Sequence, residues 1–148
     1  MAVAARCVCG NPVVVRTAPR LPDGTPFPTQ YYLTHPGAVS AASTLEATGT
    51  MREMQERLGE DAELAAAYLA AHERYLEERY GLGDVPEIHG ISAGGMPDRV
   101  KCLHVLVGHA LAAGPGVNPL GDEALALMRG EWRVDRCTCD APAASLDA

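Results

Sequence analysis

The chain has 148 residues, of which 47% are hydrophobic and 21% charged, and its formal net charge is −7. This length suffices for one domain with its own hydrophobic core. The negative charge excludes nucleic acid as a general partner, because binding phosphates requires a basic surface. No apolar stretch approaches the ~20 residues of a membrane span. The N-terminus also lacks a full signal-peptide core, so we expect a cytoplasmic protein.

The first predicted elements are two short strands. Residues 12–16 read Pro-Val-Val-Val-Arg, a run of β-branched residues typical of a strand, and residues 30–33 read Gln-Tyr-Tyr-Leu. The segment between them contains several prolines and an Asp-Gly pair, which favour turns and extended chain. The sequence therefore predicts a small N-terminal β-hairpin with a long connection.

About five helices are predicted after this hairpin. Thr34 is the expected N-cap of the first helix, which Gly49 ends. The others are expected over residues 51–58, 61–80 and 97–112, and from 119 to near Gly130. We predict an α+β fold, mainly α, with residues 1–135 as a single globular domain and residues 136–148 as a flexible C-terminal tail.

The helix expected from residue 97 is apolar nearly all round, which indicates that it is buried, yet it carries Cys102, His104 and His109. A buried polar group without a partner costs about 1–3 kcal/mol, so these side chains need a metal, a hydrogen-bond network or a reaction. In a regular helix Cys102 and His104 would point ~160° apart, and Cys102 and His109 would be separated by a rise of ~10.5 Å. Either the regular helix begins near Leu103, or only one or two of the three bind an ion.

Five cysteines and no export signal argue against a disulfide framework. We predict a zinc site that joins the hairpin to the apolar helix, with zinc favoured over an iron–sulfur cluster. Its candidate ligands are Cys7, His35 and Cys102, together with His104 or His109.

Each candidate also has a structural alternative. Cys102 can be a small buried hydrophobe, His104 a core histidine on one stripe with Val100 and Val107, and His109 part of a polar pocket. Cys9 is a weaker candidate than Cys7. The Cys137-Thr138-Cys139 segment repeats the Cys-x-Cys pattern but falls in the predicted tail.

A second hypothesis is an enzyme in which Cys102 is the nucleophile and His104 or His109 the base. Arg99 and Lys101 would then bind a small anionic substrate close to the Gly-Gly turn at residues 94–95. A third hypothesis is a non-catalytic interaction module.

Five sequence segments, taken in order, resemble the bacterial family called domain of unknown function 501 over residues 5–128. They are Arg6-Cys7 through Pro12, Pro26 through Pro36, Gly94-Gly95, Val100 through His104, and Asn118 through Gly121. The resemblance implies no activity, but genes of the family often lie beside those of a septum-formation-initiator-like protein and an exopolyphosphatase. This neighbourhood is what links the interaction-module hypothesis to cell division. The family usually has cysteine where this chain has His35, an exchange that a zinc ligand tolerates and a nucleophile does not.

Overall fold

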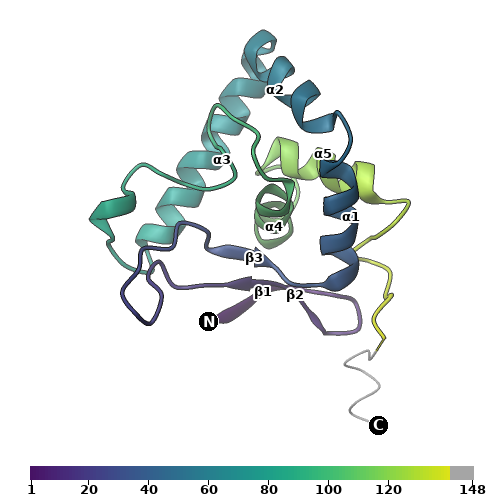
Figure 1. The fold of residues 1–148 in the computed structure, drawn as a ribbon, viewed down its shortest axis with the longest axis horizontal. Helices are drawn as coiled ribbons and strands as arrows, with labels where there is room; N and C mark the ends of the chain where they lie inside the picture. The colour runs from purple at the N-terminus through teal and green to yellow at the C-terminus, as the bar shows by residue number, and fades with distance from the viewer. Residues whose placement is uncertain (141–148) are drawn as a thin grey trace.

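A computed structural model describes residues 1–140 and places a three-stranded sheet beneath a group of five α-helices (Figure 1). The strands are β1 (Ala2–Arg6), β2 (Pro12–Arg16) and β3 (Tyr31–Leu33). The helices are α1 (Pro36–Glu46), α2 (Thr50–Glu60), α3 (Ala62–Tyr80), α4 (Leu103–Ala113) and α5 (Pro119–Met128), with a short 3-10 turn at Pro86–Ile88. The α+β, mainly α class predicted from the sequence is confirmed.

The sheet is antiparallel, with strand order β1-β2-β3. Val14 pairs with Leu33 and Arg16 with Tyr31, so the predicted hairpin between residues 12–16 and 30–33 is confirmed. Strand β1 was not predicted, because its Ala-rich sequence has low intrinsic strand propensity. It forms by pairing along β2, from Ala2 opposite Arg16 to Arg6 opposite Pro12.

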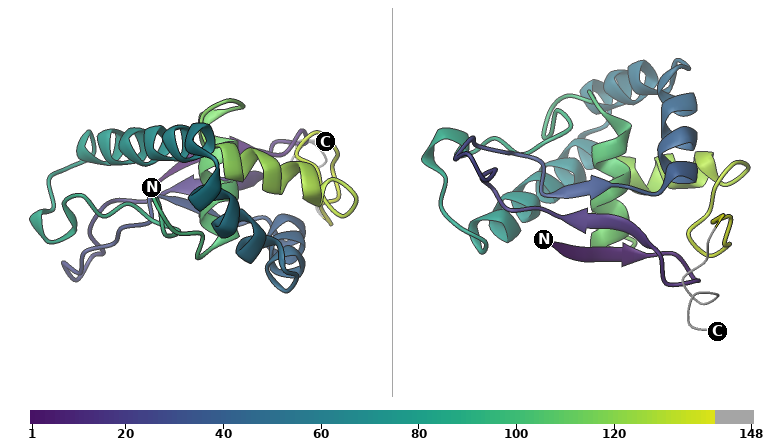
Figure 2. Two further views of the ribbon diagram at one scale, coloured as in Figure 1. Left: turned by 90° about the horizontal axis from the view of Figure 1, so that it is seen from above. Right: turned by 60° about the horizontal axis from the view of Figure 1, so that its bottom comes forward.

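Helix α4 lies at the centre of the helical layer and packs against β3, α1 and α5 (Figure 2). Its buried residues include Leu103, Leu106 and Val107, and the surrounding elements complete one core. Two glycines permit this close packing. A Cβ on Gly108 would lie 3.0 Å from the Tyr31 carbonyl oxygen, and one on Gly121 of α5 would lie 2.9 Å from the Ala110 Cβ.

Two predicted helix starts are corrected by the structure. Helix α4 begins at Leu103 and not at residue 97, because the preceding chain is tied into turns by bonds such as Arg99 N–H to the Gly95 oxygen. The N-cap of α1 is His35 and not Thr34, since the His35 Nδ1 accepts the N–H groups of Gly37 and Ala38. Both corrections bear on candidate ligands, because they set the direction of Cys102 and His35.

The chain after α5 runs down beside α1 towards the turn between β1 and β2 (Figure 1). Trp132 in this segment is buried, and Cys137 and Cys139 pack against the core. The described part of the predicted tail, residues 136–140, thus lies against the domain. Residues 141–148 of that predicted tail fall outside the described residues.

Candidate metal centres

Cys7 and Cys9 lie in a tight turn directly after β1. The Cys7 N–H donates to the Asn11 oxygen at 2.8 Å, and the Gly10 N–H donates to the Cys7 oxygen at 2.8 Å. Gly10 has a φ of +98°, a conformation that residues with a Cβ rarely adopt. Cys7 is buried and Cys9 is half-buried, so the turn holds both thiols at one end of the sheet.

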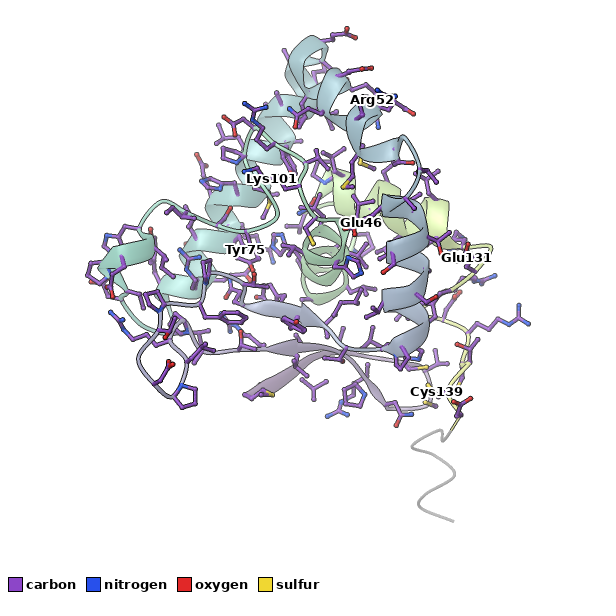
Figure 3. All side chains as sticks on the ribbon, in the orientation of Figure 1. Glu46, Arg52, Tyr75, Lys101, Glu131 and Cys139 are labelled. Carbon is purple, nitrogen blue, oxygen red and sulfur yellow. The ribbon has the colours of Figure 1, made fainter. Side chains whose placement is uncertain are left out.

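Cys137 and Cys139 meet this turn from the other end of the chain. The four sulfur atoms of Cys7, Cys9, Cys137 and Cys139, here called the four-thiol cluster, all lie within 4.8 Å of one another. The Cys139 Sγ is 3.6 Å from the Cys9 Sγ and 3.8 Å from the Cys7 Sγ. Zn–S bonds of about 2.3 Å in a regular tetrahedron imply S···S separations of ~3.8 Å. Figure 3 shows Cys139 with other sulfur atoms where the C-terminal segment meets the β1–β2 turn.

His35 borders the four-thiol cluster. Its Nε2 lies 3.2 Å from the Cys139 Sγ, and its ring lies 5.5 Å from that of Trp132. Because Nδ1 accepts backbone N–H groups at the start of α1, the proton of the neutral ring belongs on Nε2. His35 is therefore oriented to donate an N–H to the Cys139 sulfur.

The surroundings of Cys7 disfavour a free thiolate. Burial raises the pKa of the Cys7 thiol above its ordinary value. A thiolate at this position needs a nearby positive charge, which a metal ion supplies most directly, because a coordinated thiol is deprotonated outright.

A second group of possible ligands joins α1 to the start of α4. Ligand atoms of Glu46, Cys102 and His104, here called the Glu46 cluster, lie within 4.8 Å of one another. The Glu46 Oε2 accepts the Leu103 N–H at 2.8 Å and lies 3.1 Å from the His104 Nδ1. The His104 Nε2 lies 3.1 Å from the Ser43 Oγ. Glu46 therefore holds the first turn of α4 and orients the imidazole.

The Cys102 thiol lacks the electrostatic signature of a nucleophile. Burial, which is the largest effect, and the neighbouring Glu46 carboxylate raise its pKa above the ordinary value. Reactive cysteines have a lowered pKa, so this environment gives no support to the hypothesis of a Cys102-dependent enzyme.

His109 lies in the core, away from both clusters. Its ring stacks on Tyr31 at 5.7 Å and meets Tyr75 edge-on at 5.0 Å. The Asn118 Nδ2 lies 3.2 Å from its Nδ1, and its Nε2 has no hydrogen-bond partner among the described residues. Burial lowers the pKa of His109 to about 4, so the ring is neutral near pH 7.

The five ligands predicted from the sequence thus occupy three places. Cys7 belongs to the four-thiol cluster and His35 borders it, whereas Cys102 and His104 belong to the Glu46 cluster and His109 is in the core. The structural alternatives for the two histidines are exchanged: His109 is the core histidine, and His104 lines a cavity.

Four residues of the two clusters were missing from the predicted set: Cys9, Glu46, Cys137 and Cys139. The repeated Cys-x-Cys pattern at the two ends of the chain was the signal that could have identified three of them. Glu46 carried no such signal, because an acidic residue near the end of an amphipathic helix is common.

The predicted anion-binding residues Arg99 and Lys101 are both exposed. They line an open cavity of about 440 Å³ that also includes Gly94 and Gly95. A small anion at this position stays a prediction.

The fold and its two clusters define an α+β protein with two groups of possible metal ligands, one beside the β1–β2 turn and one between α1 and α4. The chain belongs to the family described as "Protein of unknown function (DUF501)", whose model matches residues 3–126. No curated protein and no solved structure matches the chain. Cys137 and Cys139 lie beyond the matched residues, so the family model covers half of the four-thiol cluster. Among residues 1–140, no helix is both long enough and apolar enough to span a bilayer.

Proposed function

We propose that this protein binds zinc through the four-thiol cluster. The observation that carries the proposal is the convergence of four sulfur atoms within 4.8 Å, from Cys-x-Cys pairs at opposite ends of the described chain. Four thiolates complete the tetrahedral coordination of a structural zinc ion and leave no position open for a substrate. The proposed role of this ion is to stabilise the fold.

The ion would fasten the C-terminal segment to the β1–β2 turn. Residues 129–140 contain no helix or strand, and Cys9 and Cys139 are 130 positions apart. A metal that closes so long a loop removes much conformational freedom from the unfolded chain, although this gain grows only slowly with loop length. Since metal-binding thiols must stay reduced, we also propose a cytoplasmic location.

Metal analysis of the full chain, purified without chelator, tests the proposal. We expect about one equivalent of zinc in the four-thiol cluster, and an X-ray absorption spectrum with four sulfur ligands at about 2.3 Å. The double variant Cys137→Ser/Cys139→Ser should lose this sulfur-coordinated ion. The matched control Cys102→Ser, which removes the one thiol outside the cluster, should keep it.

Three outcomes would contradict the proposal. They are less than about one-tenth of an equivalent of any metal, full metal content in the double variant, or iron in place of zinc. Circular dichroism of each variant at low temperature separates a lost ion from a lost fold.

The contact between His35 and Cys139 gives a second test of the same site. In His35→Asn the side chain can still cap α1, because asparagine is a good N-cap, but the donor aimed at the Cys139 sulfur is gone. Loss of a hydrogen bond to a metal ligand, from a residue that does not itself bind the metal, changes metal affinity by about 10–100-fold. We expect a loss in that range with the same four sulfur ligands, whereas unchanged affinity would remove His35 from the site.

A further inference from the structure

The Glu46 cluster differs from the four-thiol cluster in position and donor set. It lies where the end of α1 meets the start of α4, and it offers one oxygen, one sulfur and one nitrogen donor. Figure 3 places Glu46 beside the central helix, well separated from Cys139. Carboxylate, thiolate and imidazole are all zinc ligands, and three protein ligands with one free position are typical of catalytic zinc sites.

The backbone at Cys102 is what allows these donors to meet. Cys102 is extended, with φ −150° and ψ 112°, and the helix begins one residue later. In a continuous helix the Cys102 and His104 side chains would point ~160° apart about the helix axis, and the extended backbone at Cys102 removes this constraint. The Glu46 carboxylate, fixed by the Leu103 N–H at 2.8 Å, reaches the same point from α1.

The cluster also opens onto a cavity. Cys102 and His104 form part of the wall of a cavity of about 380 Å³ between α4 and β3, which is completed mainly by apolar and aromatic side chains such as Tyr32, Leu33 and Val105. A metal ion held by the three side chains would have its remaining position accessible from this space. The four-thiol cluster provides no such position, since all four ligands come from the protein.

We propose that Glu46, Cys102 and one ring nitrogen of His104 form a second, three-ligand site for a divalent transition metal, with an open coordination position facing the cavity. The open position would take water or a small molecule with a metal-binding end group and an apolar body. This proposal goes beyond the structural zinc site and does not depend on it, because the two clusters share no residue.

Cobalt substitution of the full-length protein tests the second site. Co²⁺ bound by four thiolates gives an intense sulfur-to-metal absorption, and Co²⁺ bound by a single thiolate gives a much weaker one. We expect two bound equivalents, one with each spectrum. Cys102→Ser and His104→Gln should each lose only the weak-absorption equivalent, and Cys137→Ser/Cys139→Ser should lose only the strong one.

Two controls separate a metal site from a hydrogen-bond network that only links α1 to α4. Ser43→Ala removes the hydroxyl at 3.1 Å from the His104 Nε2 but no proposed ligand, so it should keep both equivalents. Azide, a small anion that binds open metal positions, should change the weak spectrum and leave the strong one unchanged.

The proposal is overturned if the wild type takes up no single-thiolate equivalent, or if Cys102→Ser and His104→Gln both retain it. It is also overturned if azide changes neither spectrum, because the site would then have no open position. Loss of the strong spectrum alone would count against the structural zinc site and leave the second site standing. Glu46→Gln, which can still accept the Leu103 N–H, should bind the second equivalent at least about tenfold more weakly while remaining folded.

Discussion

Protonation of His109 should destabilise the fold in mild acid. Burial lowers its pKa from the ordinary value of 6.5 to about 4; the Glu78 charge opposes this shift, and the Arg74 charge adds to it. Between these two values the unfolded chain binds a proton that the folded chain does not. The contribution of neutral His109 to the stability of the fold is therefore fully present above about pH 6.5, and it falls as the pH decreases towards 4.

The size of this effect follows from the pKa difference. Each pKa unit corresponds to about 1.4 kcal/mol, so the full effect is about 3 kcal/mol, of which about 2 kcal/mol is already lost at pH 5. This is a large fraction of the 5–15 kcal/mol that stabilises a typical domain. Urea unfolding at about pH 7.5 and about pH 5 measures it.

His109→Gln is the matched variant, because glutamine can accept a hydrogen bond from the Asn118 amide but does not titrate. Metal loss in acid lowers the stability of the wild type and of His109→Gln alike. When both proteins have the same zinc content, this effect cancels in the difference between their pH dependences. We expect the wild type to lose about 2 kcal/mol more than the variant between the two pH values. If the two pH dependences agree within about 0.5 kcal/mol, His109 is not a buried neutral histidine in solution.

Two other predictions concern packing and metal removal. Gly121→Ala should destabilise the protein by about 1–3 kcal/mol in urea unfolding, because its Cβ would overlap the Leu106 carbonyl, whereas Gly59→Ala on α2, with no atom within 4 Å, should be neutral or stabilising. A stable Gly121→Ala protein would show that α4 and α5 do not pack this closely. Chelation should release the C-terminal segment, so that limited trypsin digestion cuts first after Arg133 and Arg136. Equal cleavage rates with and without chelator would contradict the proposal that the metal ion fastens the C-terminal segment to the β1–β2 turn.

Local patterns predicted most of the fold because each pattern reflects one nearby physical preference. The apolar residues of α3 repeat at helical spacing, and Tyr68, Ala71 and Tyr75 are indeed buried. The Pro-Val-Val-Val-Arg run forms β2, since β-branched side chains favour extended backbone. Strand β1 was not predicted, because its sequence has low strand propensity and its extended conformation depends on pairing with β2.

The two histidines of α4 show why periodicity could not locate the site. A helix that is apolar nearly all round has no distinct polar face, so its periodicity does not indicate which histidine points inward. The decision comes from neighbours distant in the sequence. Tyr31 and Tyr75 enclose His109, whereas Ser43 and Glu46 contact His104.

The four-thiol cluster posed the same problem over a longer range. Nothing local to Cys137 indicates that the chain returns to the β1–β2 turn, and a Cys-x-Cys pair near a terminus is weak on its own. The two Cys-x-Cys pairs come together because Trp132, which follows α5, is buried against His35. This contact places the C-terminal segment beside the β1–β2 turn. The sequence therefore indicates one thiol of the cluster and its neighbouring histidine, whereas the placement of Cys9, Cys137 and Cys139 beside them comes from the fold.

The position of His35 explains how this end of the molecule would tolerate the charge of the proposed ion. A zinc ion with four thiolates carries a net charge of −2, which is costly beside a partly buried surface. His35 is the N-cap of α1, so the cluster lies next to the positive end of that helix dipole. The Nε2–H aimed at the Cys139 sulfur adds a hydrogen bond to the anionic ligand set, from a ring whose orientation the same N-cap fixes. One side chain thus starts the helix and stabilises the thiolates, and this is why His35→Asn should weaken zinc binding while leaving α1 intact.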